Sequence, residues 1–488
     1  MSLSDREQAL PGPAGVPLAD PFWSVLRFRT APVERLLALQ PRYGDLFAVA
    51  AGQPSLVCAI GAEHNRTVLT QPDLFLHESA FPFRTPKGTA FARFNTSLVL
   101  LNGEQHRRHR RLLQPAFARS ALDRYVAPIV ERCARQLQRW PQGRVVDAVV
   151  LIRELTLAAV VSALFGVDLS DSAQTLGRLA VAQLTALSSP LTLLLPLAVP
   201  GTPFHRLLSV CEKLEAQLLA LIDERRRRGA PSGDVLSILL HAHQATAATA
   251  GSDGPAGERL SDTELIGELN TLFVAGHETT ANTLSWTLFL LTQHPQILAR
   301  VEDELAAVLG PRPPTLDDLP RLVFLGRVID ESMRLLPATP VLFMRVCAEP
   351  VTLAGHVLST GTRLALSPLM THREPTLFPQ PRRFDPDRWA TLHPTPYQYL
   401  PFGAGPRMCL GAAFATQTLR LMLPMILQRF RPQLAASARV DAVVRGISCT
   451  PHPGLPITLH AREPGQPPPS APHKPVQGSI TALVDLPQ

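Results

Sequence analysis

One long apolar helix is the feature that most limits how this chain can fold. The segment opens with Ser261-Asp-Thr-Glu264, a capping box in which the two side chains satisfy free backbone N–H groups at a helix start. Its apolar periodicity continues to His294-Pro295, where the proline ends it. A helix of about 33 residues is about 50 Å long at about 1.5 Å per residue. We therefore expect this helix to cross the whole body of the protein.

The remaining sequence favours a mainly α fold with small β-sheets. Glycine and proline punctuate two short stretches, 47–60 and 351–366, which predicts small sheets there. Thr315-Leu-Asp-Asp318 predicts the start of another helix, which runs to Leu336 before a proline. The main part of that helix covers residues 320–336, and the other predicted helices cover residues 120–140, 150–165, 206–229, 295–309 and 411–430.

The domain organisation follows from the composition of the two ends. Residues 1–19 have turn composition, and residues 463–488 include a proline-rich run, so both ends are expected to be flexible. Residues 20–462 are expected to form a single domain, with the small polar stretch 244–258 as a mobile connector.

Composition excludes several classes of protein. The chain has 488 residues, of which 45% are hydrophobic and 18% charged, which is too apolar for a disordered chain. Its six cysteines form no C-x-x-C pair, so a disulfide scaffold and a zinc ribbon are excluded and a reducing, cytoplasmic location is favoured. The net charge of +7 comes almost entirely from arginine and is weak evidence for nucleic-acid binding.

The sequence predicts no membrane anchor. The N-terminal residues are polar and then proline-rich, without the apolar region of a signal peptide. The apolar run from Leu191 to Val199 is interrupted by Pro196 and is too short to span a bilayer.

A glycine-rich loop around one cysteine is the strongest chemical signal. It reads Phe402-Gly-Ala-Gly405-Pro-Arg407-Met-Cys409-Leu-Gly411 and is followed by a predicted helix. Free amides and the dipole at a helix start stabilise a thiolate, and Arg407 adds a nearby cation. The alternatives are a buried structural cysteine and a dinucleotide-binding loop, but Met408 occupies the third glycine position of the latter and a βαβ context is missing.

The middle of the long helix carries a second signal, Ala275-Gly276-His277-Glu278-Thr279-Thr280. Glycine weakens a helix and threonine hydroxyls bond back to carbonyls, so a local bulge or kink is predicted. An acid beside a hydroxyl there is typical of a proton relay. The alternative is a weak helical turn with a solvated glutamate, which the apolar flanks disfavour.

Two further motifs pair charged side chains along helices. Glu331 and Arg334 share a helical face with apolar neighbours, and Arg388 is a candidate second arginine for the same glutamate. His106 and Arg110 also share a face, which predicts a carboxylate clamp, although a basic surface helix or a nucleic-acid patch fits the run 106–111 as well.

Together these four motifs closely resemble the cytochrome P-450 (heme-thiolate) family over roughly residues 30–460. The cysteine loop fits the family pattern F-x-x-G-x-R-x-C-x-G without a gap. The resemblance implies the cytochrome P-450 fold, with heme b between the long central helix and the helix after the cysteine loop. It implies Cys409 as the axial ligand of the heme iron, Glu278 and Thr279 as the acid–alcohol pair above the iron, and Glu331, Arg334 and Arg388 as a structural triad. It also implies that the heme propionates bind His106, Arg110, Arg345 and Arg407.

The resemblance further implies a monooxygenase that uses O2 to insert one oxygen atom into a lipophilic molecule such as a fatty acid, terpenoid, steroid or polyketide. Arg84, Lys87 and Arg93 offer an alternative, an acidic head group. Because no flavin or iron–sulfur segment is visible, electrons are expected from a separate ferredoxin or flavodoxin with its reductase, docked near Arg107–Arg111. The pocket candidates are Phe81, Phe83, Leu272, Ala275, Val341 and Leu342.

Three other readings remain open. A heme-thiolate enzyme can instead use peroxide or rearrange its substrate, although the Glu278-Thr279 pair favours oxygen activation. A non-catalytic heme-binding or gas-sensing protein would need an output module, and none is visible. A nucleic-acid binder would leave the cysteine loop unexplained.

Overall fold

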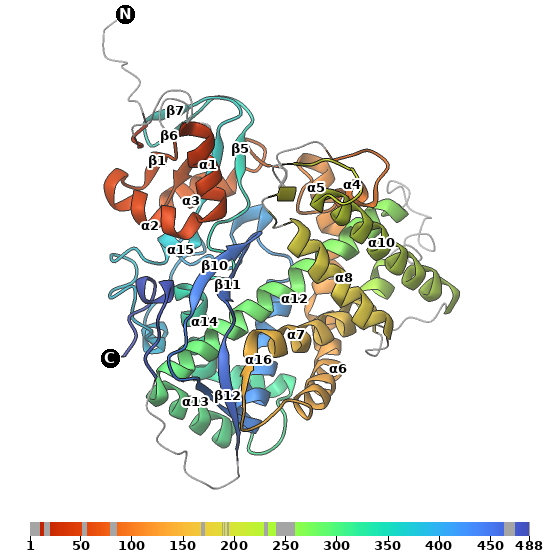
Figure 1. Ribbon diagram of the computed structural model, residues 1–488, viewed down its shortest axis with the longest axis vertical. Helices are drawn as coiled ribbons and strands as arrows, with labels where there is room; N and C mark the ends of the chain where they lie inside the picture. Colours follow the sequence, from red (N-terminus) through yellow and green to blue (C-terminus); the bar gives the residue numbers. More distant parts are fainter. Residues whose placement is uncertain are drawn as a thin grey trace, which may run out of the picture.

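The structure, a computed structural model, shows a helical body with a smaller sheet-containing part at one end (Figure 1). It describes residues 10–13, 20–50, 56–78, 85–166, 171–187, 189, 191–192, 195–228, 233–240, 259–462 and 474–487.

The α-helices account for most of the described chain, as the sequence predicts. The N-terminal half contains α1 (Asp20–Thr30), α2 (Pro32–Tyr43), α3 (Ala62–Thr70), α4 (Ala90–Phe94), α5 (Gly103–Leu113), α6 (Arg119–Leu137), α7 (Ala148–Phe165), α8 (Asp171–Leu187) and α10 (Pro203–Arg228). The C-terminal half contains α12 (Asp262–Gln293), α13 (Pro295–Val308), α14 (Val323–Leu335), α15 (Pro368–Thr371) and α16 (Ala412–Arg429). Short 3-10 helices are η1 (Gln114–Phe117), η2 (Leu316–Arg321), η3 (Pro386–Ala390), η4 (Gly405–Arg407) and η5 (Ser479–Ala482).

The strands form four small sheets. The five-stranded sheet has the order β1-β2-β8-β5-β3, in which only β2 and β8 are parallel, and the three-stranded sheet has the order β4-β12-β9. The strands β6 and β7 form one hairpin and β10 and β11 another. The strands are β1 (Leu46–Ala48), β2 (Leu56–Ala59), β3 (Phe75–His77), β4 (Val145–Asp147), β5 (Arg345–Cys347), β6 (Val351–Leu353), β7 (His356–Leu358), β8 (Arg363–Leu366), β9 (Phe430–Leu434), β10 (Asp441–Arg445), β11 (Ser448–His452) and β12 (Pro456–Ala461).

The helix α12 is the spine of the body, as its sequence predicts. Both halves of the capping box form: Glu264 N–H donates to Ser261 Oγ at 3.3 Å and Ser261 N–H to Glu264 Oε2 at 2.7 Å. The helix ends at His294, because Pro295 starts α13. In Figure 1 α12 runs diagonally through the molecule, and it packs against α7, α4, α14 and α16.

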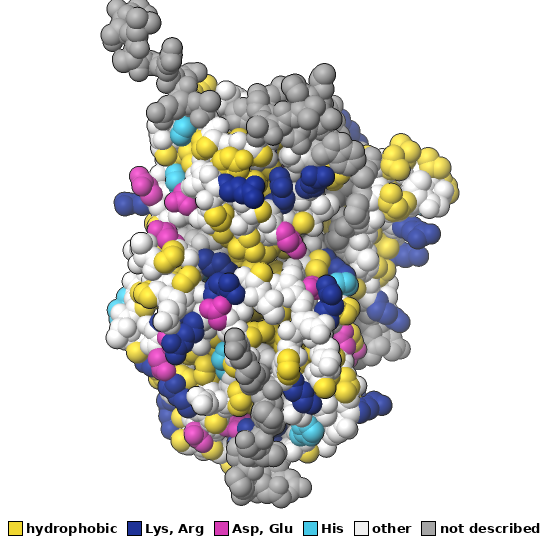
Figure 2. Space-filling model, turned by 60° about the vertical axis from the view of Figure 1, so that its left-hand side comes forward, with side chains coloured by type: hydrophobic (Ala, Val, Ile, Leu, Met, Phe, Trp, Pro, Cys, Tyr) yellow, Lys and Arg dark blue, Asp and Glu magenta, His cyan; other side chains and the backbone are white. Residues whose placement is uncertain are grey.

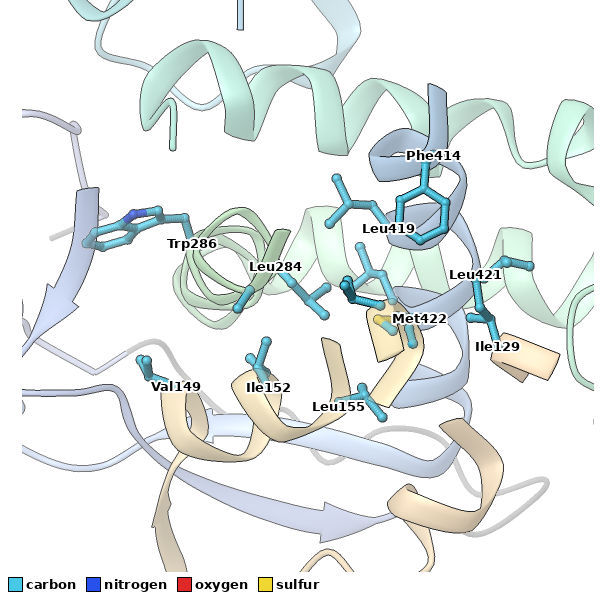
Figure 3. Close-up of a cluster of buried hydrophobic side chains, with 14 of the residues drawn as sticks. Ile129, Val149, Ile152, Leu155, Leu284, Trp286, Phe414, Leu419, Leu421 and Met422 are labelled. Carbon is cyan, nitrogen blue, oxygen red and sulfur yellow. The ribbon is translucent and has the colours of Figure 1, made fainter. Parts of the chain in front are cut away.

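The core lies where α7 and α16 meet the second half of α12. Figure 3 shows Ile152 and Leu155 of α7 beside Leu284 of α12 and Met422 of α16. Trp286 is fully buried, and its indole N–H donates to Cys449 O at 3.0 Å. Full burial of one large apolar side chain contributes about 1.5–3 kcal/mol. This packing fixes α12 against α16, the helix that follows the cysteine loop.

The structure corrects two predictions about secondary structure. The helix predicted from 315 to 336 is broken, because Pro320 lies in η2 and Leu322 leaves the helical conformation before α14 begins. The prediction of a flexible C-terminal tail is wrong for residues 474–487. They include η5 and the buried side chains Ile480 and Leu483. The connector predicted at 244–258 and the N-terminal residues 1–9 and 14–19 lie outside the described residues.

Among the described residues, one helix, α7, is long and apolar enough to cross a membrane, and 72% of it is buried inside the protein. It packs between α6 and α12, so its apolar sequence is explained by the core.

Candidate functional site

A cavity lies between α12 and the cysteine loop. The volume of this cavity is about 280 Å³. Its walls come from segments far apart in the sequence, including α5, α7, α12, the chain after α14, and the loop and helix around Cys409. Sequence motifs that are separated by hundreds of residues are therefore brought to one place.

The cysteine loop is held in one shape by its backbone. Cys409 N–H donates to Phe402 O at 2.9 Å, which closes the loop just before α16. Gly405 has φ +72°, and a Cβ there would lie 2.3 Å from Leu69 O of α3, so only glycine fits. The Cys409 side chain is accessible from the cavity, although the surrounding protein encloses it.

The environment of the Cys409 sulfur has opposing effects on the pKa of the thiol. Burial raises the pKa of the thiol, while the Gly411 N–H and the Arg110 guanidinium favour the thiolate. A bound cation would complete the stabilisation of the anion, because the thiolate is the form that ligates metals.

Four predicted cofactor ligands line the same cavity: His106, Arg110, Arg345 and Arg407. Arg110 Nη1 donates to Met408 O at 2.9 Å, and Arg407 Nη2 donates to Leu101 O at 2.7 Å. Within the residues that the structure describes, none of the three arginines forms a salt bridge with a carboxylate.

The charge of this cluster fits an anionic ligand. Burial and the neighbouring Arg407 lower the pKa of Arg345 to about 9, and burial with Arg407 and Arg110 lowers the pKa of His106 to about 4. Arg407 Nε is buried without a hydrogen-bond partner among the described residues. Among the described residues no carboxylate pairs directly with these arginines, and the two carboxylates of a heme would do so. These residues and Cys409 therefore fit heme.

Sequence reasoning missed His77 at the end of β3. Its side chain lines the cavity beside the Phe343 ring, with the centroids 5.1 Å apart. Its Nδ1 is buried without a partner among the described residues, and burial next to Arg345 and Arg407 lowers its pKa to about 2. A neutral imidazole is therefore available as a further donor at this edge. No local sequence pattern marks it, because its neighbours come from other segments.

The side chains of the α12 motif, residues 275–280, point in two different directions. Thr279 lines the cavity, and its hydroxyl donates to Ala275 O at 2.7 Å; Thr280 bonds to Gly276 O in the same way at 2.8 Å. The predicted bulge does not form, because α12 remains α-helical throughout Asp262–Gln293.

Glu278 does not line the described cavity, which differs from the expectation of an acid directly above the iron. Its Oε1 lies 3.4 Å from Arg153 Nη2 of α7, and the same nitrogen donates to Thr450 Oγ1 of β11 at 3.4 Å. Successive residues on a helix point about 100° apart, and the cavity lies on the side of Thr279 and Thr280, whereas Glu278 points toward α7. Burial raises the pKa of Glu278, although Arg153 and Arg445 act against the shift.

The structure places Glu331, Arg334 and Arg388 in one buried cluster. Arg334 binds Glu331 through two bonds of 2.9 Å, and Arg388 Nε donates to Glu331 Oε1 at 2.9 Å. Trp389 Nε1 adds a bond to Glu331 Oε2 at 3.0 Å. The remaining N–H groups of Arg334 donate to three backbone carbonyls, those of His372, Pro381 and Arg383.

A second buried acid was also missed. Glu268 of α12 is fully buried and lines the cavity, and His109 Nδ1 of α5 lies 2.7 Å from its Oε1. His109 Nε2 lies 3.1 Å from Glu264 Oε1, which Arg108 also binds at 2.7 Å. This network joins α5, which carries His106 and Arg110, to the first half of α12.

The substrate-pocket candidates have mixed outcomes. Leu272, Ala275 and Leu342 line the cavity. Val341 does not; it packs against another apolar cluster, because adjacent residues of an extended segment point to opposite sides. Phe81, Phe83 and Arg84 lie outside the described residues. Arg93 pairs with Glu215 of α10 through both carboxylate oxygens instead of facing the cavity.

The cysteine before a helix start, the cavity walled by a long helix and the cationic cluster at its edge fit the class of heme-thiolate proteins. Comparisons with known proteins give the family. Residues 11–455 match the sequence profile of the family described as Cytochrome P450. The chain therefore belongs to the cytochrome P450 family and is a heme-binding monooxygenase.

Curated relatives and solved structures agree. The chain is 32% identical over 460 residues to pentalenene oxygenase of Streptomyces avermitilis, with 93% of this chain and 98% of the relative covered. It is 32% identical over 436 residues to cyclooctat-9-en-7-ol 5-monooxygenase of Streptomyces melanosporofaciens, with 86% and 88% covered. A structure of cyanobacterial CYP120A1 with bound retinoic acid superposes with a TM-score of 0.77 at 25% identity, covering 93% of this chain and 99% of the other.

When bound, the heme supplies the activation of O2, and a thiolate ligand favours O–O cleavage. The family also requires a lipophilic substrate and a redox partner.

Proposed function

We propose that this enzyme inserts one oxygen atom from O2 into a terpenoid, with heme b as cofactor and a separate ferredoxin or flavodoxin, with its reductase, as electron donor. The apolar cavity wall carries the proposal. Many of the side chains that line the cavity are aliphatic, for example Leu98, Val99, Val160, Leu164, Leu272 and Ile447. Such a wall binds a hydrocarbon skeleton by excluding water, and it offers few hydrogen-bond partners to a polar group.

The relatives support the substrate class. One is named for pentalenene and another for cyclooctat-9-en-7-ol, and both names refer to terpenoids. At 32% identity the chain shares their general architecture. We therefore expect a substrate of related size and polarity.

In this proposal each side chain has a separate task. Cys409 would hold the heme iron through its thiolate, and His106, Arg110, Arg345 and Arg407 would hold the heme carboxylates. Thr279 Oγ1 holds a proton at the cavity wall and passes it on after its hydrogen bond to Ala275 O opens. The Glu278 side chain, which is about one-sixth exposed beside Arg153, takes up protons from solvent. It then returns a proton to the Thr279 hydroxyl through water.

The first experiment tests the thiolate. We expect the reduced, CO-bound protein to show the red-shifted Soret band of thiolate ligation, and Cys409→Ser to lose it. A second experiment titrates terpenoid hydrocarbons and alcohols, fatty acids and hydrophilic molecules while the heme spectrum is followed. Tight binding of a hydrophilic compound, with no response to any apolar one, would contradict the proposed substrate class.

A third experiment tests the source of electrons and oxygen. Product should form with a reduced carrier and O2, and much less with peroxide alone; the opposite result would favour a peroxygenase. The proposed docking face at Arg107 and Arg111 is exposed, but both arginines also bind Glu104. Figure 2 shows one face of the molecule, on which basic side chains are interspersed with acidic ones. High salt should therefore slow reduction only moderately.

A further inference from the structure

The C-terminal residues 474–487 form a strap that crosses two parts of the molecule. They lie beyond residue 455, where the match to the family profile ends. Ile480, Leu483 and Val484 are no more than 2% exposed. Burying three aliphatic side chains fixes the strap to the main core, to which all three belong.

One end of the strap is bonded to the root of the β10–β11 hairpin. Gln477 pairs with Arg439 in a parallel bridge, and Val440 N–H donates to Gln477 O at 2.8 Å. Ser479 N–H donates to Asp441 Oδ1 at 2.7 Å, and its hydroxyl accepts from Ala442 N–H at 3.0 Å. Backbone and side chain of the strap thus hold three consecutive residues of the hairpin root, 440–442.

The approach is close enough to require glycine at one position. Gly478 has φ +113°, and a Cβ there would lie 2.4 Å from Val440 O and 2.8 Å from Asp441 Oδ1. Any side chain would push the strap away from β10. Gly478 therefore offers a way to loosen this junction without removing residues.

The other end of the strap is bonded to the segment held by the Glu331 cluster. Asp485 N–H donates to Arg382 O at 3.0 Å, and Arg382 Nη2 donates to Thr481 O at 2.8 Å. Arg334 bonds to the carbonyls on both sides of Arg382, those of Pro381 and Arg383. The strap therefore links a rigid anchor to the hairpin.

The far end of the hairpin reaches the cavity. Ile447, at the turn between β10 and β11, lines the cavity, and Cys449 N–H donates to Ala338 O, a second lining residue, at 2.8 Å. The next residue, Thr450, accepts from Arg153, the partner of Glu278. A shift at the hairpin root would therefore move a wall of the cavity.

We propose that the strap formed by residues 474–487 is a specificity-determining element, which positions the β10–β11 hairpin and through Ile447 sets the shape of the cavity. Its effect on substrate rests on the proposed function of the cavity; its effect on the hairpin does not. The strap acts as a positioning element and takes no part in the chemistry.

The test compares two matched glycine variants in the full-length holoenzyme. Gly478→Ala places a methyl group against Val440 O. Gly44→Ala is the control, because Gly44 has a comparable backbone conformation (φ +81°, ψ −155°) but nothing within 4 Å of the new methyl. Hydrogen–deuterium exchange of residues 441–452 is measured without substrate. We expect about tenfold faster exchange in Gly478→Ala and no change in Gly44→Ala, because local opening governs amide exchange. Unchanged exchange in Gly478→Ala would overturn the proposal.

The second readout is the ratio of dissociation constants for two apolar ligands of different size, taken from heme-spectral titrations. We expect a several-fold change in this ratio in Gly478→Ala and in a chain ending at residue 473, with the Soret band of the CO complex retained. Faster exchange with an unchanged ratio would also overturn the proposal. If the shortened chain fails to give that band, Gly478→Ala alone decides. Failure of terpenoids to bind leaves the exchange result intact, so the two proposals fail separately.

Discussion

Two glutamates on either side of the cavity have opposite environments. Glu331 of α14 is fully buried, and its two oxygens accept from Arg334, Arg388, Trp389 and the backbone N–H of Asp385. Within the described residues, the Glu278 carboxylate of α12 has one hydrogen-bond contact, to Arg153 at 3.4 Å, at the limit of hydrogen-bond distance. A carboxylate that accepts several hydrogen bonds is held in one orientation, whereas one with a single weak partner can turn.

The difference distinguishes a structural role from the proposed catalytic role. The Glu331 cluster fixes the loop 379–385 through its hydrogen bonds to Pro379, Pro381, Arg383 and Asp385. The Glu278 side keeps its groups loosely held, as proton transfer requires. Four changes test this contrast, from the largest expected effect to the smallest.

Glu331→Gln should have the largest effect. The amide leaves the positive charges of Arg334 and Arg388 buried and uncompensated, which costs about 3–5 kcal/mol of unfolding free energy. Denaturant unfolding of the holoenzyme measures it. Glu131→Gln, which breaks an exposed pair with Arg135, is the control and should be unchanged within error. Equal stability of the two variants would refute the anchoring role.

Thr279→Ala should leave stability almost unchanged but separate electron use from product formation. The variant removes the hydroxyl that holds a proton at the cavity wall, so product per electron should fall at least about tenfold and peroxide should accumulate. Thr279→Ser keeps the hydroxyl and should restore most of the coupling. Full coupling in the alanine variant would remove Thr279 from the relay.

Arg153→Gln should alter the pH dependence of product formation more than its maximum. Because Arg153 holds the pKa of Glu278 below the value that burial alone would give, its loss should raise that pKa further. The midpoint assigned to Glu278 should therefore move to higher pH. Thr450→Val, which removes the other partner of Arg153 without changing charge, should keep the original midpoint. An identical profile in Arg153→Gln would show that Glu278 does not limit turnover.

The smallest effect is expected at Glu264. Although burial acts against it, hydrogen bonds from Arg108, Ser261 and His109 lower the pKa of Glu264 to about 2. A lowered carboxyl pKa stabilises the fold above the unfolded value near 4.5, and the contribution is lost as the pH falls from about 4.5 to about 2. Glu264→Gln should flatten this part of the stability curve, as measured by thermal unfolding at several pH values. A curve as steep as that of the unmodified protein would contradict the assignment.

Local patterns predicted the features that depend on neighbouring residues. The helix α12 follows from its capping box and from Pro295, and the pair Glu331–Arg334 follows from its spacing of three. The cysteine loop could be recognised because glycine, arginine and cysteine at fixed spacing determine a backbone shape.

Contacts between distant segments could not be predicted in the same way. His77, Arg153 and Glu268 acquire their roles from residues on other elements, and nothing in their own surroundings marks them. The strap was missed for a related reason: the composition of 463–488 as a whole resembles a linker, and the three buried apolar side chains Ile480, Leu483 and Val484 are too few to change that composition. The direction of a side chain could not be predicted either. Val341 lies next to the cavity-lining Leu342, but its side chain packs into another apolar cluster.

The close contact between Gly405 and the carbonyl of Leu69 has a consequence for synthesis. The segment that presents the sulfur rests on a helix made near the beginning of translation, while the loop itself emerges only in the last fifth of the chain. Contacts so far apart along the polypeptide form slowly, since a long loop must close first. Cys409 therefore reaches its final position late, after most of the helices have been synthesised.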